Sequence, residues 1–231
     1  MQFQGKTYRF IDTAGLRRPA RNKDNVERFS VSRTLNAVAK SDIVILMLDA
    51  SEGRITEQDK RIASRIIEVG SGCIIIWNKW DLVANKAATW KELEKNTRDE
   101  LNLMEYAPII ACSAQSGLRV EKVFETINEV RESCRHVIPQ DRLNEILRDA
   151  LLIQPPPADR GRPLFIRKLQ QLHQAGVIFK VDCSNPPALH FSYRRYLINQ
   201  IRQEYPFIGW PIRTVVGAIE KKVHKSGGKR A

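Results

Sequence analysis

A stretch near the start of the 231-residue chain carries residue types that suit a phosphorylated ligand. It reads Asp-Thr-Ala-Gly at 12–15 and directly follows an apolar run. The carboxylate of Asp12 suits a nucleotide-bound Mg²⁺ that it reaches through water, and Gly15 lets a backbone N–H approach a terminal phosphate closely. With Thr13 and Ala14 between them, the stretch predicts a loop that senses phosphate and magnesium.

A second stretch, Asn-Lys-Trp-Asp at 78–81, has the groups that reading a guanine edge requires. The ionised carboxylate of Asp81 can accept two parallel hydrogen bonds, and guanine offers the adjacent N1–H and N2–H donors that adenine lacks. Asn78 can brace the loop and touch the base edge, while the methylene stem of Lys79 can cover a purine face. The pair Asn78 and Asp81 predicts guanine selectivity, and a polar turn at a strand end is the alternative for this short motif taken alone.

The elements expected to position these motifs are short apolar runs rich in β-branched residues, at 7–12, 43–49, 73–78 and 108–112. Their almost continuous apolar character is typical of parallel strands that are buried on both faces. Helical periodicity lies between them, at about 56–69, 89–103 and 118–134, with a further helix-like segment at 24–40. Thr56 suits the N-cap of the first of these helices. The alternation predicts an α/β domain over 1–137, with a parallel sheet and helices on both faces.

Each motif follows a predicted strand, and ligands of open parallel sheets bind beyond the carboxyl ends of the strands. Ser113 and Ala114 follow the last strand, and the small side chains there let a backbone N–H approach the guanine oxygen. Three such motifs in this order are much more specific than any one of them. The sequence therefore predicts a nucleotide site at one edge of the sheet.

A small α+β module is expected over 138–222, followed by a flexible basic tail over 223–231. Its elements are a helix, two strands, a helix and a strand, at about 141–153, 164–172, 177–182, 192–204 and 211–217. Three consecutive prolines predict an irregular loop over 154–163, and the HQAG segment predicts a hairpin turn between the first two strands. In the second helix, Tyr193 and Tyr196 are expected in the core.

The net charge of +12 is concentrated in the second module. Residues 1–136 contribute +3 and residues 137–231 contribute +9. Such a basic segment favours a polyanionic partner such as RNA, and solubility is the simpler alternative. The basic residues predicted to contact RNA phosphates are Arg160, Arg162, Arg167, Lys168, Arg194, Arg195 and Arg202.

Other residue patterns exclude several classes of protein. The chain has no apolar run near the roughly 18 residues that a membrane span needs, and its N-terminus has no apolar leader core. The four cysteines form no C-x-x-C pair, and the four histidines have no metal-ligand spacing. We therefore expect reduced thiols, a cytoplasmic location and no membrane partner.

The three motifs resemble those of translation-factor-type GTPases. DTAGLRRPA followed by VERFSVSRTLNAVAKSDIVILMLDASEGRITEQDKRIA is similar to the second GTPase domain of the bacterial Der (EngA) family. GRPLFIRKLQQ and NPPALHFSYRRYLINQIRQEYPFIGWPIR resemble the terminal KH-like domain of that family. The resemblance implies GTP or GDP and Mg²⁺ as ligands, a role in maturation of the large ribosomal subunit, and rRNA as a partner.

The chain also departs from the pattern of these families. It contains no G-x-x-x-x-G-K-[ST], so the resemblance implies that this loop, the first switch and a first GTPase domain precede residue 1. We expect only weak GTP binding and no measurable hydrolysis by this chain alone. Leu16 stands where many GTPases have a water-orienting glutamine. The second module has no G-x-x-G loop, so RNA binding by the usual KH cleft is not expected.

Two other interpretations stay open at this point. The chain can be a non-catalytic RNA- or ribosome-binding module whose nucleotide site is vestigial. It can also be a GTPase of the related Era type, which joins one GTPase domain to a KH domain. The RRYLINQIR stretch and the missing G-x-x-G favour Der over Era.

Overall fold

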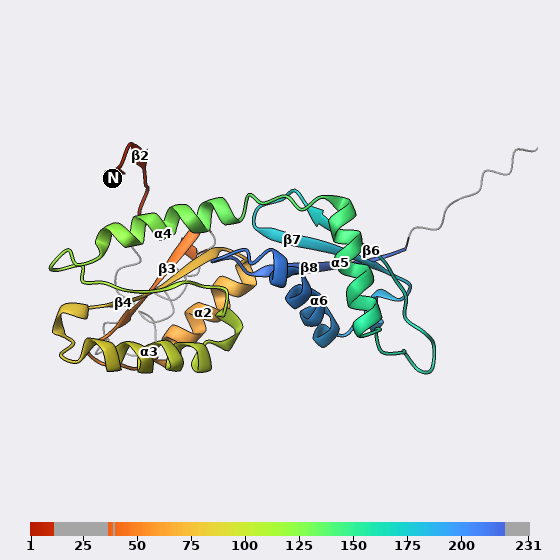
Figure 1. The fold of residues 1–231 in the computed structure, drawn as a ribbon, viewed down its shortest axis with the longest axis horizontal. Coiled ribbons are helices and arrows are strands. Elements are labelled where there is room, and N and C mark those ends of the chain that lie inside the picture. The colour runs from red at the N-terminus through yellow and green to blue at the C-terminus, as the bar shows by residue number, and fades with distance from the viewer. Residues whose placement is uncertain (12–36, 39, 220–231) are drawn as a thin grey trace, which may run out of the picture. The chain divides into compact units, whose positions relative to one another are not determined.

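The computed structural model in Figure 1 describes residues 1–11, 37–38 and 40–219. The predicted loop at 12–15, most of the helix-like segment at 24–40 and the tail at 223–231 lie outside the described residues. The chain divides into two compact units. Unit 1 comprises Met1–His136, Ala175–Val177 and Pro206–Ile212, and unit 2 comprises Val137–Gln174, Ile178–Tyr205 and the residues from Arg213 onward.

Unit 1 is built on the expected parallel sheet. Its strands are β3 (Ile43–Asp49), β4 (Gly72–Asn78) and β5 (Ile109–Ala111), in the order β3-β4-β5. Both neighbouring pairs are parallel, with Leu46 opposite Ile75 and Ile76 opposite Ile110. The prediction of a parallel α/β sheet is therefore confirmed.

Strand β4 is apolar along its length because helices cover both of its faces. Cys73, Ile75 and Trp77 belong to the same core as residues of α2 (Glu57–Val69) and α3 (Lys86–Glu100). Figure 1 shows α4 (Val120–Ser133) across the opposite face of the strands. Side chains alternate between faces along a strand, so a strand covered on both sides needs apolar residues at every position.

Local signals set the ends of the helices in unit 1. The side chain of Thr56 caps α2 in a reciprocal capping box with Asp59, as the sequence predicts for Thr56, and Gly70 ends the helix with a φ of 83°. Two single turns, η1 (Trp80–Leu82) and η2 (Asn102–Met104), follow β4 and α3. The turn η1 leads from β4 toward α3, and η2 leads from α3 toward β5.

The N-terminus differs from the prediction of a strand over 7–12. The structure has a two-stranded antiparallel hairpin of β1 (Gln2–Phe3) and β2 (Lys6–Thr7), and residues 8–11 form no strand. The rings of Phe3, Tyr8 and Phe10 contact Phe124 of α4, with centroid separations of 4.3, 5.1 and 6.1 Å. Aromatic packing on a helix thus replaces sheet pairing for these residues, and the predicted strand is wrong where the structure describes it.

Segment Pro206–Ile212 completes unit 1, although the sequence assigns it to the second module. The N–H of Cys73, near the start of β4, donates to the carbonyl of Gly209 at 2.7 Å. The buried indole N–H of Trp210 donates to the carbonyl of Val130 at 2.7 Å. That carbonyl is among the last four of α4, which have no partner within the helix, so Trp210 caps the helix end.

Unit 2 contains the α+β elements expected from the sequence. They are α5 (Gln140–Ile153), β6 (Ile166–Leu172), β7 (Val177–Cys183), η3 (Pro186–Ala188), α6 (Phe191–Glu204) and β8 (Ile212–Ala218). The strand order is β6-β7-β8, and β6 and β7 form an antiparallel hairpin. No helix in the described part of the chain is long and apolar enough to cross a membrane.

The two tyrosines of α6 join this helix to α5. The hydroxyl of Tyr193 donates to the carbonyl of Gln154 at 2.6 Å, and that of Tyr196 donates to the carbonyl of Ala150 at 2.9 Å. Tyr193 is buried and Tyr196 is partly buried. Burial raises the pKa of Tyr193 to about 12. Both side chains pack inside unit 2, as the sequence predicts.

The proline-rich loop at 154–163 is more regular than expected. Asp159 and Arg162 pair as an antiparallel bridge, with both backbone hydrogen bonds at 2.9 Å. Arg160 and Gly161 between them have φ angles of 48° and 77°. Positive φ at both central residues is the pattern of a type I′ hairpin turn. The sequence did not predict this turn, because the prolines at the start of the loop indicated irregular structure throughout.

Candidate functional site

The carboxyl ends of β3 and β4, and the loop after β5, bring several polar residues to one edge of the sheet in unit 1. Asp49 ends β3, Asn78 ends β4, and Ser113 follows β5. The Asp12–Gly15 loop lies outside the described residues. Of the predicted set, the structure describes Asn78, Lys79, Asp81, Ser113 and Ala114.

Asn78 connects the ends of all three strands. Its side-chain oxygen accepts a hydrogen bond from the N–H of Ala114 at 2.9 Å, and its backbone carbonyl accepts one from the N–H of Ala50 at 2.9 Å. Its amide nitrogen is 3.5 Å from the sulfur of Met47, which is a weak acceptor. The amide N–H groups of Asn78 are thus the polar atoms of this side chain that can still serve a ligand.

Lys79 is held in a defined direction by Asp49, a residue that sequence reasoning missed. The Nζ of Lys79 is 2.6 Å from Oδ2 of buried Asp49, and the backbone of Lys79 has a φ of 64°. Oδ1 of Asp49 accepts from the N–H and the hydroxyl of Ser51, at 3.0 and 2.6 Å. Burial alone would raise the pKa of Asp49, but the hydrogen bonds from Lys79 and Ser51 outweigh it and lower the pKa below 3.8.

Asp81 presents an exposed carboxylate on the short turn η1. The turn is anchored by buried Trp80, whose backbone N–H donates to the carbonyl of Cys112 at 3.0 Å. The ring of Trp80 packs edge to face against the ring of Trp90. The carboxylate of Asp81 has no hydrogen bond or ion pair with any other residue that the structure describes. A fixed backbone with an open carboxylate is the arrangement that accepting hydrogen bonds from a base requires.

The loop after β5 is tied to itself as well as to Asn78. Ser113 is fully buried, its N–H donates to the carbonyl of Leu118 at 3.0 Å, and its hydroxyl accepts from the N–H of Ser116 at 3.2 Å. The N–H of Ala114 is engaged by Asn78. Both N–H groups of the Ser113–Ala114 pair therefore have partners within the protein. Donation to a guanine oxygen requires that Asn78 share or release the N–H of Ala114.

Two family models match the chain, one over each part. The model described as the elongation factor Tu GTP-binding domain matches residues 1–133. The model described as the KH-domain-like C-terminal part of EngA bacterial GTPase enzymes matches residues 138–216. The chain belongs to the Der (EngA) family of GTPases.

Curated relatives carry the same family name. GTPase Der of Caldanaerobacter subterraneus subsp. tengcongensis is 43% identical over 208 residues, which cover 90% of this chain and 47% of the relative. GTPase Der of Desulfitobacterium hafniense is 41% identical over 215 residues, which cover 93% of this chain and 48% of the relative. The chain thus spans about half the length of the curated relatives it matches.

A solved structure of Era in complex with MgGDPNP and nucleotides of 16S ribosomal RNA resembles the chain weakly. The TM-score is 0.41 at 15% sequence identity, over 90% of this chain and 75% of that one. A likeness this low assigns no ligand to the Der-family chain.

The metal ligand expected from the sequence, Asp12, lies outside the described residues. The described ranges contain no group of three His, Cys, Asp or Glu side chains that could hold a metal ion.

The basic residues predicted to contact RNA lie on three parts of unit 2, the KH-like part of the Der family. Those on the hairpin at 159–162 are Arg160 and Arg162, those on β6 are Arg167 and Lys168, and those on α6 are Arg194, Arg195 and Arg202. Arg160, Arg162, Arg167 and Arg195 are exposed, and the other three are partly buried. Lys168 donates from Nζ to the side-chain oxygen of Gln170 at 3.0 Å.

Proposed function

We propose that unit 1 recognises the guanine base of a nucleotide at the edge formed by the ends of β3, β4 and β5. The observation that carries the proposal is the hydrogen bond between Asn78 and Ala114, which joins two of the predicted base-reading loops. The chain is also homologous to GTPases of the Der family. Open parallel sheets bind ligands at this edge.

Three side chains would divide the recognition of the base. The open carboxylate of Asp81 accepts from N1–H and N2–H of guanine, and the amide N–H groups of Asn78, whose present acceptor is the weakly accepting sulfur of Met47, donate to the base edge. The ion pair with Asp49 holds the stem of Lys79 in a fixed direction, so it lies against the purine face without a large loss of side-chain entropy. A few exposed hydrogen bonds of about 1 kcal/mol each leave the affinity for the base alone at about millimolar.

The phosphates and Mg²⁺ would be held by Asp12, Thr13, Ala14 and Gly15, and Asp12 would reach the metal through water. Bound Mg²⁺ would supply positive charge against the phosphate oxygens. The 231 residues contain no G-x-x-x-x-G-K-[ST], so backbone N–H groups of such a loop are not supplied by this chain. We therefore expect weak GTP or GDP binding and no measurable hydrolysis by this chain alone.

We further propose a cytoplasmic role in maturation of the large ribosomal subunit, with rRNA as the partner. The family membership and the charge of +9 on residues 137–231 support this role. The second candidate is a non-catalytic RNA- or ribosome-binding module with a vestigial nucleotide site. The charge of +9 on residues 137–231, which attracts RNA without any nucleotide, supports that candidate.

The base assignment is tested by exchanging Asp81→Asn. An amide donates and accepts, so it complements xanthine, which has a carbonyl in place of N2. We expect the substitution to weaken binding of the guanine nucleotide by about 1–3 kcal/mol and to shift preference toward the xanthine nucleotide. Binding of GDP and XDP is measured in a chain to which a G-x-x-x-x-G-K-[ST] loop has been restored at the N-terminus, because the affinity for the base alone is too weak to show such a loss. Asp99→Asn, on exposed α3, is the matched control, and equal GDP affinity in the Asp81 variant would refute the assignment.

A paired titration separates the two candidate functions. Labelled GTP and labelled rRNA fragments are titrated at two salt concentrations, and phosphate release is measured in parallel. RNA affinity that falls with salt, together with guanine-selective nucleotide binding, supports the GTPase-type interpretation. Salt-sensitive RNA binding without any guanine selectivity supports the non-catalytic module.

A further inference from the structure

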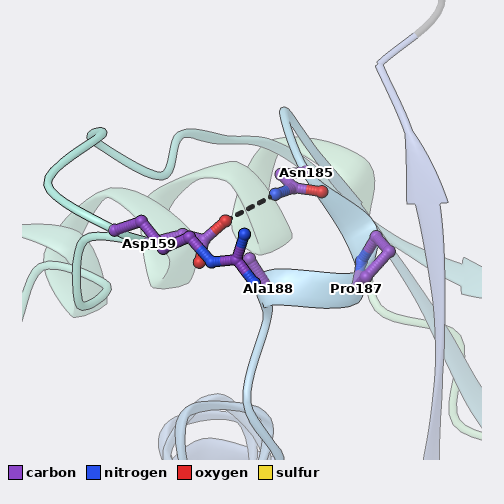
Figure 2. A pocket seen from close by; sticks show the side chains of 5 residues that line it. Asp159, Asn185, Pro187 and Ala188 are labelled. Atoms are coloured by element: carbon purple, nitrogen blue, oxygen red, sulfur yellow. Dashed lines mark hydrogen bonds between the residues drawn. The ribbon is translucent and has the colours of Figure 1, made fainter.

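Unit 2 contains an open surface cavity of about 350 Å³ at the hairpin within the proline-rich loop. Figure 2 shows it from close by, with side chains contributed by the hairpin and by the turn after β7. The residues that line it are Asp159, Arg160, Asn185, Pro187 and Ala188. The cavity thus combines a carboxylate, a guanidinium and an amide with a small apolar surface.

The walls of the cavity are fixed before any ligand arrives. The amide nitrogen of Asn185 donates to Oδ2 of Asp159 at 2.8 Å, and this bond joins the two loops in Figure 2. The hairpin is closed by its two backbone hydrogen bonds, and the N–H of Ala188 donates to the carbonyl of Asn185 at 3.1 Å. Walls that are already ordered lose little entropy when a ligand binds.

The backbone at Arg160 is in a conformation that arginine disfavours. Its φ of 48° lies in the left-handed region, where the Cβ of a residue other than glycine is strained. Asn, Asp and Gly are the residues usually found at this position of a type I′ turn. Backbone strain of this kind is concentrated at functional sites, and here it places the arginine at the rim of the cavity.

The polar groups of the cavity match the edge and face of a nucleobase. With Oδ2 bonded to Asn185, the other oxygen of Asp159 is an acceptor for an amino group. Pro187 and Ala188 offer a small apolar contact for the edge of a ring, and a guanidinium can stack on the face of a base. Arg160 and Arg162 are exposed on the same hairpin, where they can meet the flanking phosphates.

We propose that this cavity holds one base of single-stranded RNA and prefers bases that carry an amino group. Cytosine and adenine can donate their amino group to Asp159, as carboxylates do accept from cytosine N4. Uracil has no amino group, and the carbonyl oxygens beside its N3–H would face the carboxylate. The inference deepens the proposed RNA association of unit 2 and is independent of the nucleotide site in unit 1.

The test uses the full chain and three labelled hexaribonucleotides, oligo(C), oligo(A) and oligo(U), in fluorescence anisotropy at low salt. We expect oligo(C) and oligo(A) to bind about threefold or more tightly than oligo(U), because the remaining oxygen of Asp159 can accept from an amino group and not from a carbonyl. In Asp159→Asn we expect the preference over oligo(U) to fall below about twofold, since an amide can also donate to a uracil carbonyl.

Arg160→Gly tests the arginine without unfolding the hairpin. Glycine adopts a positive φ without strain, so this variant should be at least as stable as the wild type. We expect all three RNAs to bind about fivefold more weakly, through lost stacking, and the salt slope to fall by about 0.7. Arg148→Ala, an exposed arginine on α5 that does not line the cavity, removes the same charge and is the matched control.

Three outcomes separate this inference from the broader proposal. Equal affinity for the three RNAs, or equal losses in Arg160→Gly and Arg148→Ala, would overturn the cavity assignment while leaving RNA association intact. Absence of RNA binding at low salt would overturn both. A base preference that Asp159→Asn removes, with a larger loss in Arg160→Gly than in the control, would support the assignment.

Discussion

A pair of glycine substitutions tests how segment Pro206–Ile212 packs against α4 in unit 1. Gly209 and Gly117 have nearly identical φ angles, +78° and +79°. A Cβ built on Gly209 would lie 2.5 Å from both γ-carbons of Val130, whereas a Cβ on Gly117 would meet nothing within 4 Å. Substitution by alanine therefore imposes the same backbone strain at both positions but a steric overlap only at Gly209.

The expected costs follow from these two contributions. The left-handed backbone costs alanine about 1–2 kcal/mol at either position. Overpacking against Val130 adds about 1–3 kcal/mol at Gly209, because γ-carbons next to a helix backbone cannot move aside freely. We therefore expect Gly209→Ala to destabilise unit 1 by about 2–5 kcal/mol and Gly117→Ala by about 1–2 kcal/mol.

The measurement is the free energy of opening of unit 1, from native-state hydrogen exchange of amides in β4. The amide of Cys73 reports the contact itself, since it donates to the carbonyl of Gly209. Its exchange should accelerate most in Gly209→Ala and little in Gly117→Ala. Equal losses in the two variants, or a loss at Gly209 below about 1 kcal/mol, would show that the segment is not packed against α4 as described.

Three further predictions concern buried polar groups. Trp210→Phe removes the indole N–H that caps the carbonyl of Val130, and urea unfolding should show a loss of about 1–3 kcal/mol because that carbonyl is left unpaired. The pKa of Asp49 is lower in the folded state than its ordinary value of 3.8, so the ionised carboxylate stabilises the fold at pH values above 3.8. This stabilisation is lost as the pH falls through the folded-state pKa. Acid unfolding curves of Asp49→Asn should lack that contribution. Burial raises the pKa of Tyr193 from its ordinary 10.0 to about 12, so the neutral phenol should stabilise the folded state fully at pH values below 10.0. That stabilisation should be lost as the pH rises toward 12, and ultraviolet titration of the phenolate can follow the loss.

The parallel sheet was predictable because each strand carries its own signal. The apolar residues of β4 form an unbroken run that ends at Asn78, and the structure begins this strand at Gly72 and ends it at the same asparagine. A strand that is buried on both faces does not alternate apolar with polar residues, so the apolar run in the sequence and the strand in the structure coincide. The helix start at Thr56 was predictable for a similar reason, because its capping box lies within four consecutive residues.

Features made by residues distant in the chain were not predictable in the same way. The aromatic run at the N-terminus has the composition of a strand, and only the position of Phe124 decides that its rings pack on a helix. Nothing near Gly209 indicates that its carbonyl will pair with β4. Asp49 follows a strand as many acidic residues do, and its role becomes visible only when the register sets Asp49 beside Asn78, next to Lys79.

The return of Pro206–Ile212 to unit 1 has a consequence for synthesis of the chain on the ribosome. Residues up to His136 emerge first, and the segment that caps α4 and pairs with Cys73 is made about 70 residues later. At about 5–20 residues per second, this is a delay of about 4–14 s. During that interval the start of β4 has an unpaired N–H and the end of α4 has a bare carbonyl. A nascent chain arrested before Trp210 should thus be more open to proteases and chaperones than the finished protein.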